Sequence, residues 1–112
     1  MRLPARVISP GRAEGTALVS AAPFSFVGGA DPQTGEILDE ATGCLGQRVA
    51  GRIFAFPRGK GSTVGSYAIY GLAKRRLGPA ALVNEEAEAI VATGAILGGV
   101  PMVDRVDLGA LQ

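Results

Sequence analysis

Short apolar runs alternate with turn-forming segments along most of this chain, which favours a mixed α/β fold over an all-helical one. Residues 5–9 and 15–20 are β-prone and lie on either side of Pro10-Gly11-Arg12. This arrangement predicts a hairpin or another tight strand connection. Residues 49–56 form the next predicted strand, which ends before Pro57 because proline cannot donate a hydrogen bond to a sheet.

A helical pattern follows this strand. Apolar residues recur near helical spacing from 64 to 77, and Gly78-Pro79 ends the predicted helix after three basic residues in its last turn. Residues 80–83 then form a short apolar run that predicts a buried strand. Strand, helix and strand in this order predict a βαβ unit.

The last third of the chain predicts one more helix and one more strand. The helix covers 87–97, with Asn84 as its cap and Glu85 and Glu86 as acids of the first turn. Residues 101–104 form the last predicted strand. The elements together predict one compact α/β domain over residues 1–112, with an early β portion followed by the βαβ unit, the helix and the strand.

The glycine-rich segment Pro57-Arg58-Gly59-Lys60-Gly61-Ser62-Thr63 joins the predicted strand to the predicted helix and is the candidate site. The first amides of a helix lack intrahelical partners and carry partial positive charge, so such a segment favours an anion. Arg58 and Lys60 add full positive charge, and Ser62 or Thr63 can cap the helix or contact a ligand.

The segment does not match a nucleotide-binding P-loop. Gly61 follows the lysine where that motif needs Ser or Thr, and glycine is missing from the required upstream position. The alternative is an ordinary strand-to-helix turn in which Ser62 or Thr63 is only a cap.

A second candidate loop begins at Gly28-Gly29 and continues to Gly35. Asp31-Pro32 and the closing glycine are typical of turns, while paired glycines permit positive φ or a close backbone approach. The loop is either part of the site or a flexible surface connection. Ile37-Leu38 could add a short strand after it.

Composition suggests a partner protein. Hydrophobic residues make up 47% of the 112 residues, charged residues make up 19%, and the mean hydropathy is +0.28, which is apolar for a small soluble protein. A sizeable partner interface would explain this. The balance of 11 basic and 10 acidic residues argues against nucleic acid or an anionic membrane as the main partner. With no transmembrane run and no secretory signal, the expected location is the cytoplasm.

The absence of histidine removes several kinds of chemistry. Ser-His-Asp and Cys-His catalysis and histidine–zinc sites are excluded, because the chain has no histidine. The single cysteine, Cys44, cannot by itself hold zinc or an iron–sulfur cluster and is interpreted as a small buried hydrophobe. No metal site is therefore expected in this chain, and any metal must come on another one. Glu85, Glu86 and Glu88 are interpreted as surface acids that complement a helix dipole rather than as catalytic acids.

Three stretches together resemble the swivel domain of the aconitase X family. They are Phe56-Pro57-Arg58-Gly59-Lys60-Gly61-Ser62-Thr63-Val64-Gly65-Ser66-Tyr67, the segment 85–97, and Gly99-Val100-Pro101-Met102-Val103-Asp104. The loop 28–35 is similar to the family's other glycine-rich loop. As a free-standing short chain, the sequence most resembles the small subunits of the family's two-chain members.

The resemblance implies a swivelling β/β/α domain that closes over a large subunit in a heterodimer. That subunit would carry a 4Fe-4S cluster, and this chain would bind none. The implied activity is that of a hydro-lyase, which dehydrates (R)-5-phosphomevalonate to trans-anhydromevalonate 5-phosphate in a mevalonate pathway for isoprenoids. The substrate is thus a phosphorylated hydroxy acid.

The resemblance also implies site residues. Ser62 falls on the family's catalytic serine, a proton acceptor, and the two loops imply substrate binding by Arg58, Lys60, Gly61, Thr63, Gly28 and Gly29. Serine is a poor base at its ordinary pKa, but nearby cations and amide dipoles in a desolvated crevice favour its alkoxide.

The sequence departs from the family at 41–46, where relatives often have a histidine and this chain has none. Two alternatives stay open. The chain could serve a dehydratase for hydroxyproline or another hydroxy acid, or it could be a non-catalytic anion-binding module.

Overall fold

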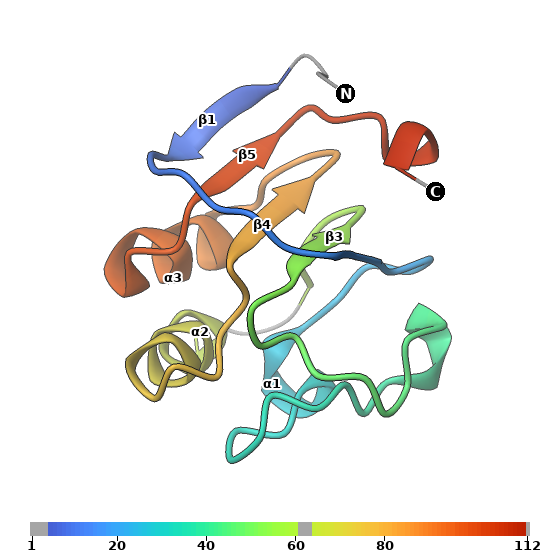
Figure 1. Ribbon diagram of the computed structural model, residues 1–112, viewed down its shortest axis with the longest axis vertical. Coiled ribbons are helices and arrows are strands. Elements are labelled where there is room, and N and C mark those ends of the chain that lie inside the picture. The colour runs from blue at the N-terminus through green and yellow to red at the C-terminus, as the bar shows by residue number, and fades with distance from the viewer. Residues whose placement is uncertain (1–4, 61–63, 112) are drawn as a thin grey trace.

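The computed structural model describes residues 5–60 and 64–111, and the segments 1–4, 61–63 and residue 112 lie outside this description. The described residues form five strands, three α-helices and two short 3-10 helices. Figure 1 shows how they are arranged. The strands are β1 (Arg6–Ser9), β2 (Ala17–Val19), β3 (Ile53–Phe56), β4 (Ala81–Asn84) and β5 (Met102–Asp104). The helices are α1 (Phe26–Gly29), α2 (Val64–Lys74) and α3 (Ala89–Gly98), with η1 (Glu40–Thr42) and η2 (Leu108–Leu111).

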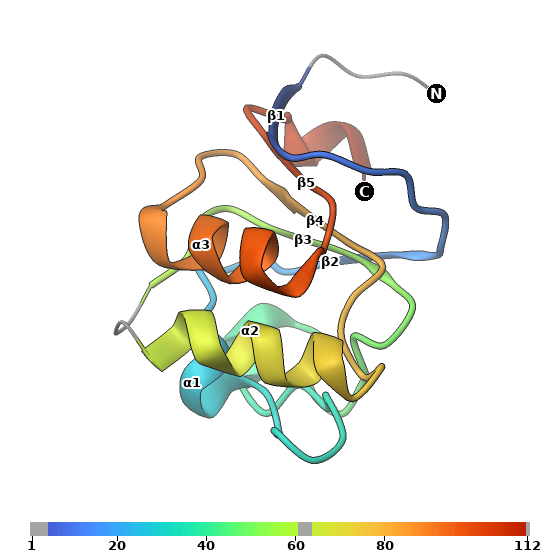
Figure 2. The same cartoon turned by 90° about the vertical axis from the view of Figure 1, so that its left-hand side faces the viewer.

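The strands form one sheet in the order β1-β5-β4-β3-β2. All neighbours are parallel except β1, which pairs with β5 in the antiparallel sense. The predicted βαβ unit is confirmed as β3-α2-β4, and β4-α3-β5 repeats the arrangement one strand further along the sheet. Because both crossovers move in the same direction and such crossovers are right-handed, both helices lie on the same face, as Figure 2 shows.

The predicted hairpin is wrong. After β1 the chain crosses the sheet to the opposite edge, where β2 pairs with β3 (Figure 1). Both segments are strands as expected, but β-propensity says nothing about which strand is the partner. The predicted strand 49–56 is also shorter, because Arg52 N–H donates to the Val49 carbonyl in a turn and Gly51 adopts a φ of 70°.

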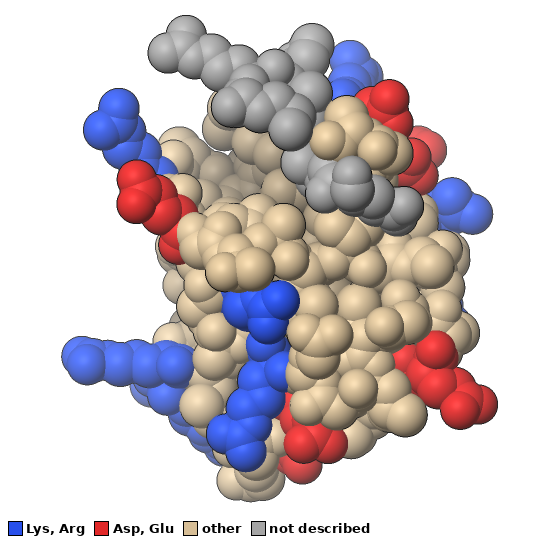
Figure 3. Space-filling view, turned by 45° about the vertical axis from the view of Figure 1, so that its right-hand side comes forward, with Lys and Arg blue, Asp and Glu red and all other residues tan. Residues whose placement is uncertain are grey.

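Alternate residues of each strand enter different clusters, as the two-residue period of a strand requires. Leu18, Phe54, Phe56, Leu82 and Met102 face the helices and form the main core. Ala55 and Val83 face the other side, where Val106 and Leu108 cover them. From the direction of Figure 3, most of the visible surface is uncharged, in line with the low charged fraction.

All four phenylalanines of the chain meet in the main core. Phe24, Phe26, Phe54 and Phe56 have ring centroids 5.0–6.2 Å apart, mostly in edge-to-face geometry. Such contacts add about 0.5–1.5 kcal/mol per pair beyond the burial of their area. The cluster joins β3 to the segment before α1.

α2 and α3 pack closely through small residues. An added Cβ at Gly94 would lie 2.9 Å from Ile69 Cδ1 and 3.1 Å from the Ser66 Cα. Ser66 Oγ donates to the Ile90 carbonyl at 2.9 Å. The two helices therefore form one layer over the sheet. Within the described ranges, no helix is long and apolar enough to span a bilayer.

Candidate functional site

The glycine-rich segment lies where the sequence predicts it. β3 ends at Phe56 and α2 begins at Val64, so the segment leaves the carboxyl end of a parallel strand and enters a helix. Its described part is Pro57–Lys60, which we call the site loop. Gly61, Ser62 and Thr63 lie outside the described residues, so their predicted roles stay predictions.

One side of the site loop is hydrogen-bonded to Phe24. The Phe24 N–H donates to the Arg58 carbonyl at 3.0 Å, and the Lys60 N–H donates to the Phe24 carbonyl at 3.0 Å. The two segments thus form an isolated parallel bridge between Phe24 and Gly59. Because the Phe24 ring is fully buried in the aromatic cluster, the core fixes this side of the loop.

The segment that follows β4 holds the other side. Asn84 Nδ2 donates to the Phe56 carbonyl at 2.9 Å, and the N–H groups of Glu85 and Glu86 donate to the Pro57 carbonyl at 3.0 and 3.1 Å. Asn84 is fully buried, and its Oδ1 has no partner among the described residues. An unsatisfied buried oxygen costs stability, and the hydrogen bond from Asn84 Nδ2 to the Phe56 carbonyl offsets part of that cost.

Gly59 is tightly packed between these supports. An added Cβ would lie 2.5 Å from Val91 Cγ2 and 2.7 Å from Glu88 Oε1. A side chain at this position would have to displace either the loop or the start of α3. Glycine is therefore required by close approach to α3.

Glu88, not Asn84, caps α3. Its carboxylate accepts from the Val91 N–H at 2.7 Å and from the Ile90 N–H at 3.1 Å. The predicted cap was wrong because Asn84 is the last residue of β4, and the helix starts only at Ala89. Glutamate is not among the preferred cap residues, so the sequence signal for Glu88 was weak. This carboxylate already occupies the first amides of α3, which leaves the loop's own cations to attract an anion.

The charged side chains of the site loop point to solvent. Arg58 and Lys60 are exposed, as are Glu85 and Glu86 on the neighbouring segment. An anion bound by the two cations would therefore lie close to acidic side chains. This arrangement favours a ligand that places its negative charge near the loop and away from the acids.

The second glycine loop approaches the beginning of α2. Gly28 is exposed with a φ of 81°, and nothing lies within 4 Å of the position of an added Cβ. It lines a groove of about 380 Å³ together with Val64 and Tyr67, the first residues of α2. Gly29 is buried, and an added Cβ would lie 3.0 Å from the Phe24 ring, so packing explains this glycine. Ligand binding by either glycine stays a prediction.

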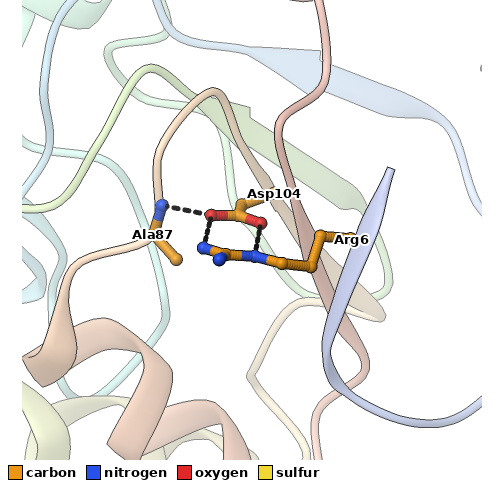
Figure 4. A network of polar contacts seen from close by, with 3 residues as sticks. All are labelled: Arg6, Ala87 and Asp104. Carbon is orange, nitrogen blue, oxygen red and sulfur yellow. Dashed lines mark hydrogen bonds and ion pairs between the residues drawn. The ribbon is translucent and has the colours of Figure 1, made fainter. Parts of the chain in front are cut away.

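An ion pair with a buried carboxylate and a half-exposed guanidinium lies beside the segment that supports the loop, and the sequence did not predict it. Arg6 donates to both oxygens of Asp104, from Nε at 2.9 Å and from Nη2 at 2.7 Å, and the Ala87 N–H donates to the same carboxylate at 2.9 Å (Figure 4). Asp104 is fully buried, while the Arg6 side chain is 47% exposed. The hydrogen bond from Arg6 holds the pKa of Asp104 below its ordinary value, and the Ala87 amide acts in the same direction against the effect of burial. The two residues are 98 positions apart, too far for any local pattern to connect them.

Cys44 is a buried hydrophobe, as predicted. Its thiol donates to the Val19 carbonyl at 3.3 Å, and burial raises the pKa of the thiol, which disfavours the reactive thiolate. In residues 5–60 and 64–111, no cluster of three or more His, Cys, Asp or Glu side chains could hold a metal ion.

Known proteins resemble this chain along its full length. The family model for the aconitase X swivel domain matches residues 2–112. The phosphomevalonate dehydratase small subunit of Pyrococcus furiosus is 54% identical over 112 residues, covering 100% of this chain and 84% of that protein. The protein of the same name from Methanocaldococcus jannaschii is 56% identical over 112 residues, covering 100% of this chain and 85% of that protein.

A solved structure has the same fold. In the crystal structure of the holo-form of Thermococcus kodakaraensis aconitase X, one chain superposes with a TM-score of 0.95 at 54% identity, covering 98% of this chain and 84% of that one. Agreement of sequence and fold over nearly every residue confirms the expected fold and the resemblance. This chain belongs to the aconitase X swivel-domain family.

Proposed function

We propose that this chain is the small subunit of a two-chain hydro-lyase that dehydrates (R)-5-phosphomevalonate to trans-anhydromevalonate 5-phosphate. The observation that carries the proposal is the full-length match to small subunits of that enzyme, with 54–56% identity. The reaction would supply an intermediate for a mevalonate pathway to isoprenoids.

The site loop supports this proposal chemically. The substrate carries a phosphate and a carboxylate, and the exposed side chains of Arg58 and Lys60 offer two cations on a rigidly held backbone. Gly61, Thr63 and Gly28 would bring backbone close to the ligand. A firmly held loop binds an anion with little reorganisation, which is the main requirement for electrostatic catalysis.

Ser62 would remove the proton beside the carboxylate. Ser62 follows Arg58 and Lys60 in the chain, with only Gly61 between it and Lys60, and it precedes α2, whose first amides carry partial positive charge. Each of these influences lowers the pKa of a hydroxyl, and exclusion of water by a closing partner would strengthen them. The proton would move from the substrate carbon to the serine oxygen.

A 4Fe-4S cluster does not fit this chain. Its one cysteine is buried and donates a hydrogen bond to a backbone carbonyl, and the chain has no histidine. A cluster of this kind needs several cysteine thiolates. We therefore assign the cluster to the large subunit.

The large subunit would bind over the groove between the second glycine loop and α2. Exposed apolar side chains gather there, namely Val27 (43% exposed), Val64 (56%) and Tyr67 (71%). Aromatic residues are enriched in the cores of protein interfaces. Because Val64 directly follows the glycine-rich segment 57–63, a partner that binds over this groove would also cover a substrate bound by that segment.

Co-expression with the large-subunit gene of the same organism tests the function. Purified complex mixed with (R)-5-phosphomevalonate should yield a product lighter by one water, followed by mass spectrometry and by the ³¹P spectrum. Hydroxyproline under the same conditions tests the alternative substrate. Conversion of hydroxyproline alone would overturn the proposed substrate, and dehydration by this chain without a partner would overturn the two-chain assignment.

A further inference from the structure

The ion pair of Arg6 with Asp104 is the only one in the described residues, and its carboxylate accepts a hydrogen bond from the segment that supports the site loop. β1 contributes Arg6, β5 contributes Asp104, and the segment between β4 and α3 contributes the Ala87 amide (Figure 4). Asp104 is the last residue of β5, the Ala87 segment follows the parallel strand β4, and Arg6 is the first residue of the antiparallel β1, so all three meet at the carboxyl ends of β4 and β5. Their meeting point fixes the path of residues 85–88.

That path determines where the site loop lies. Two residues before Ala87, the segment already holds the loop, because Glu85 and Glu86 both donate to the Pro57 carbonyl. One residue after Ala87, the Glu88 side chain packs against Gly59, because a Cβ added at Gly59 would lie only 2.7 Å from Glu88 Oε1. The Asp104 carboxylate therefore lies one hydrogen bond away from a segment whose amides bind the Pro57 carbonyl and whose Glu88 side chain packs beside Gly59.

We infer that Asp104 and Arg6 are positioning residues for the site loop. Asp104 fixes the Ala87 amide, the segment 85–88 then fixes the backbone of 57–59, and Arg6 keeps the Asp104 side chain in its orientation. The role that we assign to the pair is to hold backbone, not to contact substrate. This inference rests on the proposed function only in its kinetic part.

The geometry separates this role from general stabilisation. A bidentate arginine fixes the plane of a carboxylate as well as its charge. One oxygen, Oδ2, accepts from both Arg6 and Ala87, so a rotation of the carboxylate would break the bond to the supporting segment. The charge pair thus defines the direction in which the Ala87 amide is held.

The test compares Asp104→Asn with a control variant that is destabilised in the core. Val49→Ala leaves a cavity at a fully buried position beside Gly35, and no hydrogen bond among the described residues joins Val49 to Asp104 or to residues 85–88. Amide hydrogen exchange of the full chain is measured by NMR for both variants. In Asp104→Asn, exchange at Ala87, Glu86 and Lys60 should accelerate at least 10-fold more than in Val49→Ala at matched Tm.

The kinetic part uses the complex with the large subunit. Asp104→Asn should lower kcat by about 10- to 100-fold at a temperature where it is fully folded, since a displacement of about 1 Å in a positioned group can cost two orders of magnitude. Val49→Ala should keep its kcat. If Asp104→Asn does not fold, Arg6→Ala replaces it, and a few millimolar guanidinium should restore kcat because the Arg6 side chain is half-exposed.

The outcomes separate this inference from the proposed function. Equal exchange at the three amides in Asp104→Asn and Val49→Ala would overturn the inference, and so would accelerated exchange with an unchanged kcat. Should the wild-type complex fail to dehydrate its substrate, the proposed function would fall, and the exchange comparison alone would then decide the positioning of the loop.

Discussion

Ser62 is the residue on which the proposed mechanism depends most. If its hydroxyl accepts the proton, Ser62→Ala in the assembled enzyme should lower kcat by about 10²- to 10⁴-fold, the usual contribution of a positioned acid or base. If it only caps α2, the change should cost about 1 kcal/mol of stability and leave kcat nearly unchanged. Steady-state turnover and Tm measured on the same sample distinguish the two.

Thr63→Ala is the matched control, because Thr63 could cap the same helix. It should be the milder variant in kcat. Loss of turnover in Thr63→Ala together with normal turnover in Ser62→Ala would move the base by one residue and contradict the assignment.

Lys60 should act on the substrate through its charge. Removing a charged hydrogen-bonding partner costs about 1.5–3 kcal/mol, so Lys60→Ala should raise KM or lower kcat by roughly 10- to 100-fold. Because the side chain is exposed, Tm should stay within a degree or two. Arg12→Ala, at another exposed cation, is the control. Identical kinetics for both variants would reduce Lys60 to a surface charge.

Protonation of the Asp104 carboxylate should lower the stability of the fold in acid. Its pKa is lowered from the ordinary value of 3.8, mainly by the hydrogen bond from Arg6, so the folded state binds its proton less readily than the unfolded state does. The stabilisation is therefore present above pH 4 and is lost as the pH falls through the lowered pKa. Tm between pH 2 and pH 6 should fall more steeply for the wild type than for Asp104→Asn. If Tm falls equally steeply with pH in the two proteins, the loss of stability in acid does not come from Asp104.

At the level of elements, the contact between α2 and α3 depends on Gly94. A methyl group there would meet Ile69 and the backbone of Ser66 at 2.9–3.1 Å, so Gly94→Ala should push the helices apart and cost about 1–3 kcal/mol. Chemical denaturation of the chain measures this. Gly71→Ala is the matched control in α2, with nothing within 4 Å of the new Cβ, and should stabilise by about 0.4–1 kcal/mol. Equal effects at the two glycines would show that the helix contact is less close than described.

The elements also explain why the site loop forms where it does. β3 forms a strand because its residues alternate between the two clusters on the faces of the sheet, and it ends before Pro57. α2 and α3 read as helices from their apolar spacing, and α3 ends at Gly99, whose φ of 68° suits glycine. Local preference and tertiary structure agree that these elements form, but α2 ends at Lys74 instead of 77 and α3 starts at Ala89 instead of 87.

For the whole molecule, the central prediction concerns the partner. Tyr67 is 71% exposed beside the groove, so Tyr67→Ala should leave the Tm of the chain unchanged. If the large subunit covers the groove, the same change should weaken the complex by about 10- to 100-fold, as expected for an aromatic residue at the centre of an interface. Isothermal titration or surface plasmon resonance measures the Kd. Leu45→Ala, at another exposed apolar residue, is the control, and an equal loss in both variants would place the interface elsewhere.

The sequence by itself determined the strand–helix–strand order, the place of the glycine-rich segment and the family. These features depend on local preferences and on an uninterrupted motif, which are properties of neighbouring residues. Tertiary structure decided the rest. Glu88 caps α3 through neighbouring amides, but the end of β4 at Asn84 decided where that helix starts. That β1 and β2 lie at opposite edges of the sheet and that Arg6 meets Asp104 depend on pairings between distant segments. Such pairings are selected by the packing of the whole domain, so no local pattern along the chain encodes them.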